Sequence, residues 1–172
     1  MAAVACIGCG AMFEDREGPT HRYMESSPGC WAVYGEVLAR EYSDLSYASL
    51  HRLTVDAYAV QHPGRPSPQS TQSLALHLMS LCLVLERGVE PARTTAFLQT
   101  AAKPKGRFVW LVPPASQGAI TVKDVHGAGN ATEHKGLVRT WAESTWSAWA
   151  SDHGTVRRWL AETMFVTPPR SR

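Results

Sequence analysis

The sequence predicts a mainly α fold: a helical bundle with one small β-hairpin and an N-terminal loop module. Hydrophobic residues recur at helical spacing over most of residues 30–165, whereas the first 30 residues lack any sustained period and contain the cysteine pair of CIGCG. The chain has 172 residues, of which 44% are hydrophobic and 19% charged, as in an ordinary globular protein. We therefore expect one domain over residues 1–166 and a disordered tail, rich in Pro and Arg, over residues 167–172.

Most of the predicted helices lie in residues 30–103. The helical period first covers residues 30–42 and then residues 46–61, where Pro63 stops it. Ser67 is a typical N-cap for a long helix that ends before Gly88. Because this third helix is apolar almost all round, we expect it at the centre of the bundle.

The remaining elements are a short helix, a hairpin and a tryptophan-rich region. A helix with Pro91 at its start covers residues 90–102. The β-branched and aromatic stretches RFVWLV and AITVKDV, separated by PPASQG, predict a β-hairpin within residues 107–125. Two helices follow over residues 132–165, where Gly154 separates them. Their tryptophans either pack in the core or form a contact surface for a partner or a second copy of the chain, as in a homodimer.

Charge and hydropathy argue against two classes of partner. A formal net charge of +2, without a concentrated basic stripe, does not predict a nucleic-acid-binding protein. The longest apolar run, residues 74–85, is too short to span a bilayer, so we expect no membrane partner. The N-terminus lacks the charged and apolar regions of a secretory signal, which predicts a cytoplasmic protein. In that reducing compartment cysteines persist as thiols, metal ligands or nucleophiles rather than disulfides.

The CIGCG stretch predicts a metal site. Cys6 and Cys9 have the spacing with which two thiolates clasp one ion, and the neighbouring glycines permit a tight turn. His21 and Cys30 are the nearest residues that could complete a set of three sulfurs and one nitrogen, which suits a structural Zn²⁺ ion. Such an ion would explain how a loop without a core of its own is ordered. One alternative is a redox dithiol, which requires a neighbouring βαβ unit that the sequence does not show. The other is a set of unpaired thiols with a surface histidine.

A second group of polar and titratable residues occupies the helices at residues 46–61 and 68–87. His77 is flanked by leucines three residues before and four residues after it, so its ring should face the interior and needs a partner. The candidate catalytic residues of this group are Asp56, Tyr58, His62, Gln72 and His77. They could form an acid–base set for a small-molecule substrate, or hold a second, catalytic metal ion. The structural alternative is a hydrogen-bonded core histidine, a histidine that ends its helix and a surface Asp56 paired with Arg52 four residues before it. A regular helix places Asp56 and His62 on opposite sides, so a shared metal requires the helix to end or bend near Gln61.

Two functions remain open on this reading. The first is a small zinc-binding enzyme that acts on a small molecule through a His/Asp pocket between the second and third helices, by metal-assisted hydrolysis or lyase chemistry. The alternative is a non-catalytic, zinc-stabilised binding or interaction module that uses the tryptophan-rich helix as its contact surface.

The strings CIGCG, GCW and VDAYAVQHPG, together with the FVWLVPP and WAESTWSAWASDH stretches, resemble an uncharacterised family of small bacterial proteins, a domain of unknown function. The resemblance covers nearly the whole chain. It implies a bacterial origin and a single-domain unit, and it supplies no activity. The positions that match its motifs are Cys6, Cys9, His21, Cys30, Asp56, Tyr58, His62 and His77.

Overall fold

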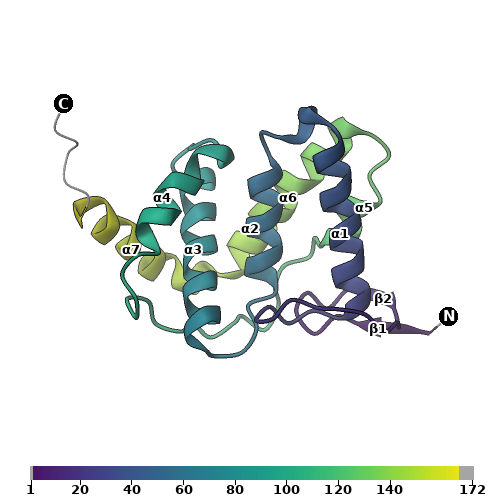
Figure 1. Ribbon diagram of the computed structural model, residues 1–172, viewed down its shortest axis with the longest axis horizontal. Helices are drawn as coiled ribbons and strands as arrows, with labels where there is room; N and C mark the ends of the chain where they lie inside the picture. Colours follow the sequence, from purple (N-terminus) through teal and green to yellow (C-terminus); the bar gives the residue numbers. More distant parts are fainter. Residues whose placement is uncertain (1, 167–172) are drawn as a thin grey trace.

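The computed structural model describes residues 2–166 and confirms the predicted fold class of a helical protein with one small antiparallel sheet (Figure 1). The predicted tail at residues 167–172 lies outside the described residues. The α-helices are α1 (Pro28–Ser43), α2 (His51–Gln61), α3 (Pro68–Leu85), α4 (Thr94–Ala101), α5 (Val122–His126), α6 (Ala131–Ala148) and α7 (His153–Val166). Short 3-10 turns, η1 (Leu45–Tyr47), η2 (Pro91–Arg93) and η3 (Ala150–Asp152), lead into helices or separate them. None of the helices in residues 2–166 is long and apolar enough to cross a membrane.

The centre of the bundle is formed by α2 as well as α3. Helix α2 packs against α3 on one side and α6 on another, while α3 also contacts α4 and α7 (Figure 1). Each residue from Asp56 to His62 is buried, polar ones included. A helix buried on every side must satisfy its polar side chains within the protein, and α2 does this at both of the candidate sites described below.

The predicted hairpin at residues 107–125 is wrong. This part of the chain contains no strand: residues 107–120 cross the molecule without pairing, and residues 122–126 form α5. The physical reason is a capping box, in which Thr121 accepts from the backbone of the first turn while Asp124 accepts from the Thr121 backbone N–H at 2.8 Å. Two carbonyls of this segment, those of Gln117 and Ile120, accept from Nε2 of buried Gln61 in place of a neighbouring strand.

The small sheet lies instead at the N-terminus. Strands β1 (Ala3–Ala5) and β2 (Met12–Glu14) pair antiparallel, with Val4 opposite Phe13. The CIGCG stretch forms the connection between them, and the hydrogen bond from Cys6 N to Ala11 O extends the pairing into it. Each strand has three residues, which is too short to show a strand period, so the sequence pattern did not reveal this hairpin.

The tryptophans in α6 and α7, and Trp149 at the C-cap of α6, are core residues. Trp141 and Trp149 are fully buried, and Trp146 and Trp159 are nearly so. The indole N–H of Trp141 donates to Gln61 Oε1 at 2.9 Å, so this ring also has a polar partner inside the bundle. Their burial in the isolated chain argues against the alternative in which these rings form a contact surface.

Candidate functional site

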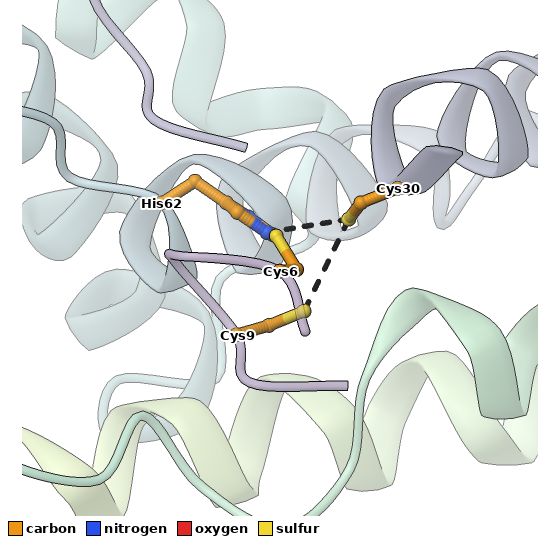
Figure 2. Close-up of side chains that lie close together, drawn as sticks. All are labelled: Cys6, Cys9, Cys30 and His62. Carbon is orange, nitrogen blue, oxygen red and sulfur yellow. Dashed lines mark hydrogen bonds between the residues drawn. The ribbon is translucent and has the colours of Figure 1, made fainter. Parts of the chain in front are cut away.

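Three cysteines and one histidine converge beneath the first turn of α1. The sulfurs of Cys6, Cys9 and Cys30 and a ring nitrogen of His62 all lie within 4.8 Å of one another. Figure 2 shows the four side chains pointing toward a common centre from the N-terminal loop, the start of α1 and the end of α2. These residues could hold a metal ion.

The loop that carries Cys6 and Cys9 turns tightly around the centre. Gly10 N donates to Cys6 O at 2.8 Å, and Gly10 has a φ of 76°, in the left-handed region that glycine adopts without strain. A Cβ atom on Gly8 would lie 2.3 Å from Cδ2 of His62, closer than any real contact. The two glycines of CIGCG are therefore required, one for the turn and one for the close approach of the His62 ring.

Helix α1 positions Cys30. The hydroxyl of Ser27 caps the helix by accepting from Cys30 N at 3.2 Å, and Pro28 opens its first turn. The backbone N–H of Ser27 donates to the sulfur of Cys6 at 3.4 Å. Ser27 therefore fixes the Cys30 backbone through its hydroxyl and stabilises a thiolate on Cys6 through its backbone N–H.

The end of α2 positions His62. Nδ1 of its ring lies 2.8 Å from the carbonyl of Tyr58, which must accept, so Nδ1 carries the ring proton. Nε2 is left with its lone pair and lies 3.4 Å from the sulfur of Cys30. A histidine that donates through one nitrogen to a carbonyl and presents the other is oriented as metal ligands generally are.

The electrostatics of the cluster favour a cation at its centre. Hydrogen bonds from Cys30 and then Cys9 lower the pKa of the Cys6 thiol. Hydrogen bonds with Cys6 and then Cys9, together with burial, raise the pKa of Cys30. Ionisation of one thiol therefore raises the pKa of its neighbour, because two thiolates at this distance repel each other. A bound divalent cation would remove that repulsion.

The spacing of the donor atoms fits a tetrahedral ion. Zn–S bonds of about 2.3 Å in a tetrahedron place the ligand atoms about 3.8 Å apart. Cys9 and Cys30 are separated by 4.0 Å between sulfurs, and Cys30 and His62 by 3.4 Å. The cluster needs only small side-chain adjustments to take an ion of this kind.

His21, predicted as the fourth ligand, is not part of this cluster. Its ring packs against Tyr23, with centroids 4.4 Å apart, and against Trp31 at 5.5 Å. The structure brings together the three predicted cysteines with His62 in the fourth position. His62 is 32 residues from Cys30, and proximity in sequence pointed to His21 instead.

The other predicted residues divide between two sites. Tyr58 belongs to the cysteine cluster: its hydroxyl lies 3.5 Å from the sulfur of Cys30, and its ring stacks on His62. Burial, and then the negative charge of Cys30, raise the pKa of Tyr58, so it stays a neutral phenol. Asp56 and His77 contact each other elsewhere, and Gln72 lines the same cavity as His77.

Asp56 is a buried carboxylate with several partners. Its Oδ1 lies 2.7 Å from Nδ1 of His77 and 2.9 Å from the guanidinium of Arg52, and its Oδ2 accepts from the hydroxyl of Ser80. The carboxylate orients the His77 ring, while the His77 side chain keeps 17% of its surface exposed. Among the described residues, none hydrogen-bonds to Nε2 of His77. This arrangement can support acid–base chemistry, because an oriented imidazole offers one free nitrogen.

A third cluster, centred on Glu41, was not anticipated. The fully buried carboxylate accepts from Thr54 Oγ1 at 2.6 Å, from His134 Nε2 at 2.9 Å and from His51 Nδ1 at 2.7 Å. Arg40 donates to the other nitrogen of His134 at 3.3 Å. Every member has a partner, so the cluster joins α1, α2 and α6 structurally. Its signal in the sequence was a carboxylate seven residues after Tyr34, on the buried face of α1.

Comparison with known families identifies the chain. A family model described as "Family of unknown function (DUF5946)" matches residues 4–150. The chain belongs to DUF5946. Searches of the curated proteins and of the solved structures give no significant match. The part that matches DUF5946 includes all four residues of the cysteine cluster as well as Asp56 and His77, and it ends before α7.

Proposed function

We propose that the protein binds one structural Zn²⁺ ion through Cys6, Cys9, Cys30 and His62. The proposal rests on the convergence of four donor atoms within 4.8 Å from three separate segments of the chain. Three thiolates and an imidazole are a typical donor set for zinc and a poor one for Mg²⁺ or Ca²⁺, which take oxygen ligands. We place the protein in the cytoplasm, where its cysteines, all free of disulfides, would persist in the form that binds metal.

Burial supports a structural rather than a catalytic role for this ion. Cys30 and His62 are fully inaccessible to solvent, and Cys6 is 2% exposed. Four protein ligands complete a tetrahedral shell, whereas a catalytic zinc keeps a position for water or substrate. The ion would fasten the N-terminal segment to α1 and α2.

Replacing each histidine separately tests the ligand set. We expect one zinc per chain in the wild-type protein, and we expect His62→Ala to weaken zinc binding at least about tenfold. His62→Cys should restore much of the affinity, since it offers a fourth thiolate. The matched control His21→Ala should keep the wild-type metal content. Elemental analysis measures the zinc content, and competition with a chromophoric chelator measures the zinc affinity. Loss of zinc in His21→Ala with retention in His62→Ala would contradict the proposal.

We propose, as a second function, that Asp56 and His77 form an acid–base pair for a small-molecule substrate. The supporting observation is the buried carboxylate at 2.7 Å from Nδ1 of a histidine that lines a cavity. In such a pair the carboxylate holds the imidazole in one tautomer, and Nε2 exchanges a proton with the substrate, as hydrolytic or lyase reactions require. A catalytic metal fits poorly here, because both carboxylate oxygens already have partners and His62 belongs to the zinc site.

The tautomer of His77 tests this second proposal. Nitrogen chemical shifts should show the proton on Nδ1 in the neutral ring, because Asp56 accepts from that nitrogen. Asp56→Asn should shift the ring toward the other tautomer, because the amide can donate to Nδ1, while leaving the zinc content unchanged. Asp152→Asn, in η3, is the control and should leave the His77 signals in place. A wild-type ring protonated on Nε2 would argue against the pair.

A further inference from the structure

His77 opens into a groove along the first half of α3. A cavity of about 460 Å³ is lined by His77, Gln72 and Lys105, among others. Two further cavities, of about 360 and 350 Å³, adjoin it and share lining residues with it: Pro68, Gln72 and Lys105 on one side, Tyr23 and Gln69 on the other. The loop that follows α4 runs past α3 (Figure 1), and Lys105 of this loop lines the first two cavities. The groove is large enough for a small organic molecule.

The charges along this groove have one sign. Its charged lining groups are Lys105 and Arg22, and none of the described residues that line the three cavities is an aspartate or glutamate. His77 also lines the groove, with its ring paired to the buried carboxylate of Asp56. No described carboxylate forms an ion pair with Lys105 or Arg22. Burial lowers the pKa of nearby His21, and electrostatic interaction with His77 and then Arg22 lowers it further. The positive end of the α3 dipole lies at the same place, since Pro68 and Gln69 belong to its first turn.

Apolar side chains line one end of the groove and part of its middle. Phe108 and Trp110 line the cavity beyond Lys105, and Leu76 and Tyr23 flank His77. Tyr23 is 37% exposed, although one edge of its ring packs against His21. A ligand that filled this groove would therefore place an apolar or flat group on these rings and its charge near Lys105.

We propose that the groove binds a small organic anion, a carboxylate or a phosphate attached to an apolar or aromatic group. Lys105 would contact the anionic group, Gln72 would donate through its amide, and His77 would lie against the reacting part of the molecule. Only the chemical role of His77 toward the bound anion rests on the proposed acid–base pair. Binding itself rests on the charge and shape of the groove.

Simple probes test the charge preference. Phenyl phosphate and benzoate should bind at least about tenfold more tightly than benzyl alcohol or benzylamine, measured by calorimetry and by shifts of the Trp110 indole signal. Inorganic phosphate and acetate, without the ring, should bind more weakly than their aromatic counterparts. Comparison of the two aromatic anions distinguishes a phosphate site from a carboxylate site. Equal binding of benzylamine would overturn the proposal.

Two lysine variants test the place of binding. Lys105→Met should weaken binding of the better anion at least about fivefold, with little effect on benzyl alcohol. Lys103→Met is the matched control, because Lys103 is exposed two residues away and lines none of the three cavities. Equal losses in the two variants would exclude this groove. If the wild-type His77 ring proves to be protonated on Nε2 but the protein binds the anions as expected, the result would support anion binding in the groove and reject only the acid–base pair.

Discussion

Cys9→Ala should abolish stoichiometric zinc binding and lower the free energy of unfolding by at least about 4 kcal/mol, the largest effect we expect of any single substitution. Structural Zn²⁺ contributes roughly 10–16 kcal/mol in small zinc domains. Here only part of that should be lost, because α2, α3 and α6 have a hydrophobic core without the ion. Cys9 is the suitable target, since it is only partly buried and its removal leaves little empty space in the core.

Hydrogen exchange should show which segments lose stability in Cys9→Ala. The β1–β2 hairpin and the segment up to Ser27 should lose protection first, because only Cys6, Phe13 and Ser26 are buried within residues 2–27. Cys82→Ala is the control: Cys82 is a fully buried cysteine of α3 away from the cluster, so this change should cost about 1–2 kcal/mol and keep the zinc. An N-terminal segment that stays protected in Cys9→Ala would show that the ion does not hold it.

Glu41→Ala should lower the free energy of unfolding by about 3–5 kcal/mol. The side chains of His51, Thr54 and His134 all donate to this carboxylate, and its removal leaves their polar atoms inside the protein without acceptors. Because these partners come from α2 and α6, the loss should appear in the global transition, with the zinc content unchanged. Denaturant unfolding followed by circular dichroism measures it.

Glu36→Ala is the matched control on the same helix. Glu36 also pairs with a histidine, since its carboxylate lies 2.7 Å from Nε2 of His126, but 63% of its side chain is exposed. An exposed pair of this kind contributes about 0–1 kcal/mol. Equal losses in the two variants would mean that burial of the Glu41 cluster does not determine its contribution.

Hydrophobic periodicity predicted the helices well because most of them bury one continuous face. It failed at residues 107–125, where β-branched and aromatic residues occur without a strand. Phe108 and Leu111 are buried one at a time against the bundle, and two carbonyls of the segment are satisfied by the Gln61 side chain. A strand-like composition reports burial, and it does not show whether another strand is available for pairing.

The candidate sites were predictable to the extent that they depend on local spacing. The two-residue gap between Cys6 and Cys9 and the helix start at Cys30 indicated a metal site from the sequence alone. The role of His62 depends on where α2 ends relative to the N-terminal loop, which is a property of the tertiary structure. For the same reason Asp56 and His77 were found in one group with His62, although the structure separates them.

The close contact between Gly8 and His62 also bears on how fast a bound ion would exchange. The loop backbone covers the imidazole so closely that not even a methyl group fits between them, and Cys6 and Cys30 are equally shielded. Cys9 is the one ligand with partial access, and it borders a cavity of about 400 Å³ together with Pro113 and Pro114. A competing chelator or an oxidant would therefore reach the centre through Cys9. The lifetime of the bound ion would then depend on the rate at which the Cys9 thiolate dissociates from it.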